Sequence, residues 1–222
     1  MRQVNASENF PQFRKFCKFP GRFRTSPQLR NPLVGPKCLH NMRREALSYE
    51  QVRHVITETI PLLSLKPWRD VPLFALLYGT AARVGEFLQI RARDIEIQEI
   101  GNSEFLVVSL ITEKNRRKPI RRVPISIEKE NWITEPILEY VDGLEPDYPL
   151  FQLSTRRIQQ LSKKYFQVHP HFLRHSRLTH LVQIYNFNDR ELVQIAGWTD
   201  SKPAQVYVHL RWSDLAMKMI SR

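Results

Sequence analysis

The sequence YGTAARVGEFL occupies residues 78–88 and joins the end of one expected helix to the start of another. Residues 69–79 are apolar on nearly every side, which predicts a buried central helix, and a second helix is expected from Arg83 to Ile90. The small residues between them would let a backbone or a ligand come close. Arg83 stands at a helix start, where the amide dipoles favour an anion. Alone this is a weak signal, because an arginine at a helix start is usually a solvated surface residue.

Regular patterns continue on both sides of this stretch. Ser48 suits an N-cap, and apolar residues at helical spacing follow it up to Pro61, where that helix is expected to end. Residues 105–111 and 120–125 are β-branched, apolar runs that predict a small hairpin with a positively charged tip over 114–118. Helices are expected over roughly 128–141, 154–167, 171–184 and 188–196, with a short pair around 202–220. The predicted fold is mainly α with a small antiparallel β-hairpin or sheet, an α+β fold.

The first part of the chain differs in composition from the rest. Residues 1–46 are rich in proline, and their ten arginines and lysines face only Glu8 and Glu45. This indicates a basic arm or a minimal subdomain ahead of one main domain over 47–222. Phenylalanines alternate there with basic residues, a pattern that could follow a DNA backbone. The same phenylalanines could equally anchor the arm on the main domain.

Composition restricts the classes of partner. The 222 residues carry 34 Lys and Arg against 22 Asp and Glu, a net charge of +12, which points to a polyanionic partner. No apolar run is long enough to span a membrane, and no signal peptide is recognisable, so we expect a soluble protein without a membrane partner. Two cysteines are too few for a disulfide framework. No glycine-rich phosphate loop is found, and no nucleotide cofactor is expected.

Two further clusters lie in the C-terminal part. The first is PHFLRH over 170–175, where the proline suits a helix start and places His171 and Arg174 one turn apart on one face. Such a pair could accept a proton and bind a phosphate. The second is AGW over 196–198, with Tyr207 nine residues after the tryptophan. Each alone is weak, because such residues are ordinarily structural or solvated.

The combination is far more specific than its parts. The order of arginine, hairpin lysine, His-x-x-Arg, Gly-Trp and tyrosine resembles the tyrosine recombinase (phage integrase) family over about residues 47–216. The resemblance implies the catalytic-domain fold of that family. It also implies a catalytic set in which every position carries an acceptable residue type. That set is Arg83, Lys114, His171, Arg174, Trp198 and Tyr207, with Glu86 as a partner that orients an arginine.

The resemblance implies cleavage of DNA through a 3′-phosphotyrosine without a metal or a high-energy cofactor. Arg83 and Arg174 would bind the non-bridging oxygens as bidentate forks. Trp198 can only donate, which suits stabilising the phosphorane. His171 would accept the proton of Tyr207, whose ordinary pKa near 10 means that it needs help at neutral pH. The hairpin lysine would protonate the leaving 5′ oxygen.

Two departures from the family pattern leave alternatives open. The hairpin is about two residues longer than usual after Lys114, so Lys118 is a rival for the lysine role. The family's usual helical core-binding domain has no counterpart in residues 1–46, which indicates either a compact member or a truncated chain. Basic hairpin residues outside the catalytic role are expected to contact DNA phosphates: Arg116, Arg117, Lys118, Arg121 and Arg122.

The function implied is site-specific DNA recombination, as the integrase of a mobile element or as a resolvase. A type IB topoisomerase and a catalytically silent DNA-binding regulator are the alternatives. The expected partner is double-stranded DNA, bound by a homotetramer on paired sites and by a monomer or dimer when free. We expect a cytoplasmic protein of prokaryotic or viral origin.

Four histidines lie close together in the sequence, which raises the question of a metal site. No carboxylate or cysteine spacing completes a recognised site around them, so no metal is expected. Two of the four, His175 and His180, are interpreted as structural histidines of the helix. The four are His169, His171, His175 and His180.

Overall fold

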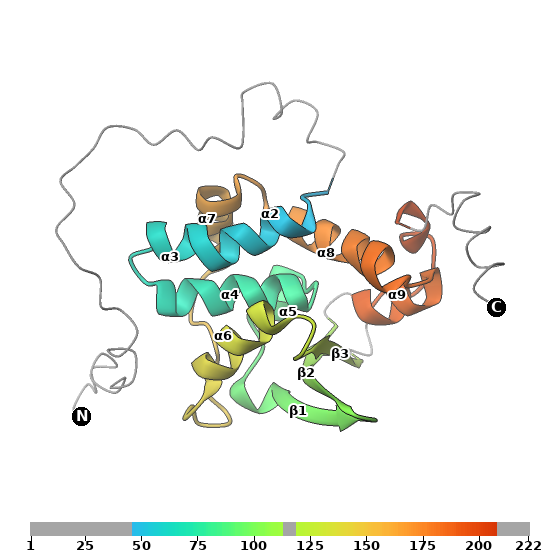
Figure 1. Cartoon of the computed structure of the whole chain (residues 1–222), viewed down its shortest axis with the longest axis horizontal. Coiled ribbons are helices and arrows are strands. Elements are labelled where there is room, and N and C mark those ends of the chain that lie inside the picture. The colour runs from blue at the N-terminus through green and yellow to red at the C-terminus, as the bar shows by residue number, and fades with distance from the viewer. Residues whose placement is uncertain (1–45, 113–118, 208–222) are drawn as a thin grey trace, which may run out of the picture. The chain divides into compact units, whose positions relative to one another are not determined.

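The computed structural model describes residues 46–112 and 119–207. Nearly all of the predicted arm over 1–46 lies outside the described residues, and so do the hairpin tip and most of the last predicted helix pair. The described part is mainly helical with one three-stranded antiparallel sheet (Figure 1). The expected α+β architecture is confirmed.

The first helical segment begins where the sequence predicts and ends later. Ser48 accepts a hydrogen bond from the backbone N–H of Gln51 in a capping box at the start of α2 (Tyr49–His54). A π-helical turn, η2 (Val55–Thr59), follows and leads into α3 (Ile60–Leu63). The prediction that the helix ends at Pro61 is wrong. The π turn restarts the helix at Ile60, which leaves Pro61 in a first turn, where its missing N–H costs little.

The central helix is α4 (Pro67–Gly79), and its second half is buried all round, as the apolar sequence predicts. It packs against α6 (Asn131–Val141) and α8 (Pro170–Tyr185). In Figure 1 it lies between the α2–α3 segment and α6. This helix therefore fixes where the loop that leads from Gly79 to Arg83 begins.

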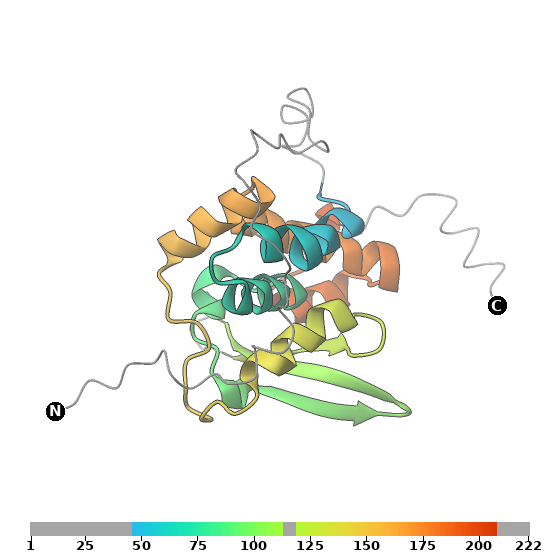
Figure 2. The same cartoon turned by 60° about the vertical axis from the view of Figure 1, so that its left-hand side comes forward.

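The sheet has the order β1 (Ile95–Ile100), β2 (Ser103–Ile111) and β3 (Ile120–Ser126). The predicted hairpin of β2 and β3 is confirmed, with Val108 opposite Val123. Strand β1 was not predicted. Its residues are exposed or half-buried throughout, so the sequence there lacks the strong apolar pattern of a core strand. Figure 2 shows α6 lying along this sheet.

The remaining elements close the C-terminal half. Helix α7 (Thr155–Phe166) buries one apolar face and is followed by α8, α9 (Asp189–Ala196) and the 3-10 turn η4 (Ala204–Val206). A buried ion pair between Glu130 and Arg177 joins the start of α6 to α8. Arg177 also donates to the carbonyl oxygen of Gly79, at the end of α4. Two short elements complete the order, α5 (Val84–Phe87) and the 3-10 turn η3 (Ala92–Asp94).

Candidate active site

Arg83 stands at the N-cap of α5, after a short loop that follows the end of α4. The chain turns there through Ala81, whose φ of 47° is in the left-handed region. Gly79 lets the end of α4 pack closely against β3, because a Cβ at that position would lie 2.8 Å from the side chain of Ile125. Arg83 keeps 20% of its side chain exposed and donates to the carboxylate of Glu86 at 2.6 Å. The helix start therefore presents a guanidinium that is oriented but still accessible.

Glu86 is fully buried and pairs with two arginines. Its other carboxylate oxygen accepts from Arg121 at 2.8 Å and from the backbone N–H of Arg83 at 3.1 Å. Burial alone would raise the pKa of Glu86. The charge of Arg121 and the hydrogen bonds from both arginines outweigh burial and hold that pKa below its usual value. Glu86 is therefore ionised and fixes the arginines around it.

Arg121, which is expected from the sequence to contact DNA phosphates, is buried in the structure. Its side chain is only 7% exposed, and besides Glu86 it donates to the backbone oxygen of Ile195 near the end of α9. A buried guanidinium with these two partners links β3 to α5 and α9. A sequence signal for this exists, because Arg121 alternates with Val123 and Ile125 on the buried face of β3.

Arg174 comes from the first turns of α8 and is 3% exposed. It donates to the backbone oxygens of Ala81 and, at 2.9 Å, of Ala196. These bonds use two of the five N–H groups of a guanidinium and leave others for a ligand. Burial and the charges of Arg83 and Arg121 lower the pKa of Arg174 to about 9. Three guanidinium groups face a single carboxylate here, so the site is short of negative charge.

Trp198 follows the end of α9. Gly197 ends that helix with a φ of 64°, and the backbone N–H of Trp198 donates back to Val193 at 3.1 Å. A Cβ on Gly197 would lie 2.8 Å from Cδ of Arg121. The Trp198 ring lies 5.8 Å from the guanidinium carbon of Arg174.

Tyr207 lies directly after η4 and contacts Trp198 and His175. Its ring stacks on Trp198 at a centroid distance of 5.9 Å. Its hydroxyl oxygen lies 3.1 Å from Nδ1 of His175, one turn beyond His171 on α8. Burial raises the pKa of Tyr207, and the charge of Arg174 lowers it in part. The hydroxyl is therefore protonated at neutral pH and would need a base to become a nucleophile.

His171 lies at the exposed start of α8, near the two arginines that flank the site. Partial burial, then the charges of Arg174, His169 and Arg83, lower its pKa, so its imidazole is neutral at pH 7. Among the described residues, the hydrogen bond of the Tyr207 hydroxyl is made with His175 and not with His171. Sequence reasoning missed His175, although its spacing of four from His171 puts both on one helix face.

The other predicted site residues are spread differently. Lys114, Arg116, Arg117 and Lys118 lie outside the described residues. Arg122 is half exposed on β3 and pairs with Glu96 of β1. Within 46–112 and 119–207, no three His, Cys, Asp or Glu side chains are close enough to hold a metal ion. In that same part of the chain, no helix has the length and apolarity needed to cross a membrane.

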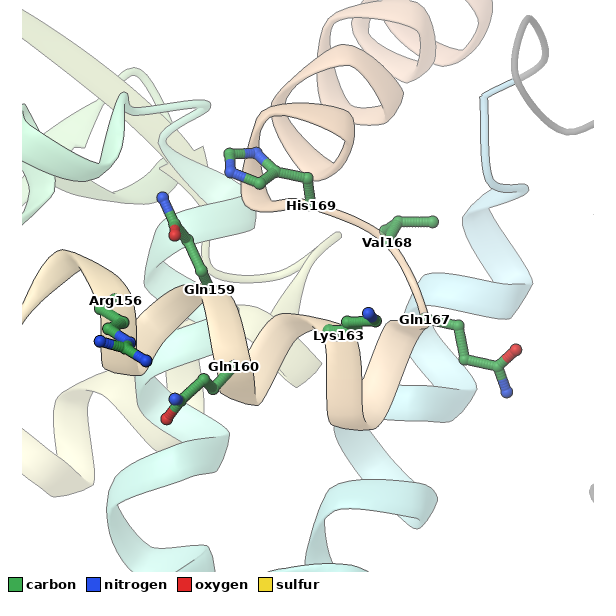
Figure 3. Close-up of a pocket in the computed structure, with 7 residues that line it drawn as sticks. All are labelled: Arg156, Gln159, Gln160, Lys163, Gln167, Val168 and His169. Atoms are coloured by element: carbon green, nitrogen blue, oxygen red, sulfur yellow. The ribbon is translucent and has the colours of Figure 1, made fainter.

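A hollow of about 460 Å³ lies beside the start of α8 (Figure 3). Its walls come from α7 and from the loop that joins α7 to α8, and they carry two cationic side chains, Arg156 and Lys163. His169, which caps α8, forms one side. The lining residues are Arg156, Gln159, Gln160, Lys163, Gln167, Val168 and His169.

The sequence matches one protein family and named members of it. The profile of the phage integrase family matches residues 45–213. The tyrosine recombinase XerA of Thermococcus onnurineus is 26% identical over 227 residues, which cover 93% of this chain and 73% of the relative. The tyrosine recombinase XerC of Alcanivorax borkumensis is 26% identical over 84% of this chain and 63% of its own length.

A comparison with solved structures shows the same fold. The XerH site-specific recombinase, solved bound to its difH substrate before cleavage, superposes with a TM-score of 0.61 at 17% identity. The match covers 78% of this chain and 53% of the XerH chain, so this chain spans about half of that recombinase.

Proposed function

The chain belongs to the phage integrase family, and on that basis we propose that it cleaves and rejoins double-stranded DNA through a phosphotyrosine at Tyr207. One observation carries the proposal. The Tyr207 hydroxyl, the imidazole of His175 and the ring of Trp198 meet beside an arginine cluster that is short of negative charge. A phosphodiester supplies the missing negative charge and the phosphorus that a tyrosine oxygen can attack.

The described side chains suit the separate demands of the reaction. Arg83 is accessible and Arg174 retains free N–H groups, so both can donate to the non-bridging oxygens of one phosphate. Their charge would stabilise the pentavalent transition state. Trp198 has an indole N–H to donate to the same oxygens. Glu86 and Arg121 would act indirectly, by fixing the directions in which the arginines point.

The departing 5′ oxygen needs a proton, which we assign to a lysine of the hairpin tip. Lys114 and Lys118 remain the two candidates. Phosphates farther along the duplex would be contacted by Arg116 and Arg117 of the same tip and by Arg122 on β3. Arg156 and Lys163, which line the hollow beside the start of α8, would contact phosphates as well. Binding should therefore weaken as the salt concentration rises. Strand exchange would take place in a homotetramer on paired sites, with a monomer or dimer when free.

The experiment compares wild type with Tyr207→Phe on supercoiled plasmid at low salt, with denaturation to trap protein on DNA. We expect wild type to relax the plasmid and become covalently linked, whereas the Phe variant still binds but does neither. Tyr148→Phe is the matched control, because that tyrosine is 39% exposed and outside the cluster. Binding without cleavage by wild type would instead support a silent DNA-binding regulator.

A further inference from the structure

The Tyr207–His175 contact places a histidine of α8 other than His171 at the reacting atom. Nδ1 of His175 lies 3.1 Å from the Tyr207 hydroxyl, and the two ring centroids are 5.1 Å apart. The sequence had suggested only a structural role for His175. His171, one turn earlier, lies instead among the charges of Arg83 and Arg174. The two histidines of this helix face are therefore not equivalent.

The direction of the hydrogen bond depends on the protonation states of the two groups and on the tautomer of His175. Burial lowers the pKa of His175, so its imidazole is neutral at pH 7. Burial raises the pKa of Tyr207, which therefore keeps its proton. Nδ1 accepts from the hydroxyl when the proton of His175 is on Nε2, which is the tautomer that a base at this atom requires. Among the described residues, the titratable groups that interact with His175 are Tyr207, beyond η4, and His171 and His180 on α8.

We propose that His175 holds the Tyr207 hydroxyl in place and accepts its proton during cleavage, a role that rests on the recombinase activity proposed above. As the tyrosine oxygen bonds to phosphorus, the phenolic proton passes to Nδ1. The bond from phosphorus to the 5′ oxygen breaks, and that oxygen takes a proton from the hairpin lysine. Rejoining reverses each transfer, and the imidazolium of His175 returns its proton to the tyrosine. His171 is then left to donate a hydrogen bond to the phosphate.

His175→Asn separates the two parts of this role. An asparagine oxygen reaches about the position of Nδ1 and can accept a hydrogen bond, but it cannot accept a proton. The measurement is the rate of covalent complex formation against pH, with unfolding and DNA binding measured alongside. His54→Asn is the control, since that histidine is exposed on α2. His171→Asn is the comparison on the same face of α8.

We expect His175→Asn to fold and bind DNA as wild type does and to cleave about 100-fold more slowly or worse. Wild-type cleavage should fall as the pH drops through the lowered pKa of His175, because the imidazole is then already protonated. This acidic limb should be lost in His175→Asn and retained in His171→Asn and His54→Asn. A wild-type rate and pH profile in His175→Asn, with Tyr207→Phe inactive, would overturn the inference and leave the proposed function intact.

A second measurement does not depend on activity. Nuclear magnetic resonance can follow the titration of His175 in wild type and in Tyr207→Phe. The phenylalanine removes the donor that favours neutral His175, so the pKa of His175 should rise in the variant. An unchanged titration would overturn the contact. A wild type that shows the contact but never links to DNA would refute the recombinase proposal, and the base role with it.

Discussion

Replacing Glu86 by glutamine tests the arrangement that keeps the arginines in place. The change conserves shape but removes the only carboxylate that faces Arg83 and Arg121 among the described residues of this cluster. Arg83 can recover contact with water because it is partly exposed, whereas Arg121 is 7% exposed and cannot. Removing one partner of a buried ion pair costs about 3–5 kcal/mol. Glutamine still accepts one hydrogen bond, so we expect the lower figure, about 3 kcal/mol.

Urea unfolding at pH 7 measures this loss, and the corresponding fall in Tm is roughly 6–12 °C. The difference should depend on pH with a definite sign. The folded-state pKa of Glu86 is lowered, so its contribution is fully present above the ordinary glutamate pKa of about 4.3. It is lost as the pH falls through the lowered folded-state pKa. Wild type and Glu86→Gln should therefore converge in stability as the solution is acidified.

The matched control is Glu130→Gln, which breaks the other buried pair, with Arg177. Both variants should lose stability at pH 7. Only Glu86→Gln should also lose cleavage under conditions where it remains folded, by about 100-fold, because a guanidinium displaced by about 1 Å costs that much. A Glu86→Gln variant within about 1 kcal/mol of wild type at pH 7, or an equal loss of cleavage in both variants, would refute the proposed role of Glu86 in holding the arginines.

Two further predictions concern the end of α9. Arg121→Gln should lower the free energy of unfolding by about 3 kcal/mol and should also lower the cleavage rate, because it removes the partner of Glu86 and of the Ile195 carbonyl. Weaker DNA binding at unchanged stability would mean that Arg121 contacts phosphate after all. Gly197→Ala should lower the free energy of unfolding by about 2–4 kcal/mol, measured by thermal or urea unfolding. The φ of 64° at Gly197 disfavours any Cβ, and a Cβ there would also meet Arg121. Wild-type stability in this variant would show that the loop adjusts.

Much of the fold follows from local patterns, and the exceptions have physical reasons. The apolar residues of α4 are enough to predict a helix, and the β-branched runs of β2 and β3 are enough to predict two strands. Strand β1 has no such local pattern. Neither of its faces is buried, and it is held as a strand by its backbone hydrogen bonds to β2. The continuation past Pro61 depends on a π turn, which no residue type marks in advance.

The candidate site divides in the same way. Residue types and their order pointed to Arg83, Glu86, Arg174, Trp198 and Tyr207, and the structure brings these five together. The role of a residue was harder to foresee where it depends on a partner distant in sequence. Arg121 was grouped with its basic neighbours, although the alternation of β3 places it inward. The contact of His175 with Tyr207 spans 32 residues, so no local sequence pattern predicts it.

The cationic character of the site follows from how its arginines are held. Arg174 and Arg121 bond to backbone oxygens of Ala81, Ala196 and Ile195, at or next to helix ends. A carbonyl orients a guanidinium without cancelling its charge, whereas a carboxylate would neutralise it. One carboxylate among three arginines therefore secures the geometry and leaves the charge for a phosphate. Because the same bonds hold the loop after α4 and the end of α9, a substitution that weakens anion binding here should also weaken the packing of that loop and that helix end.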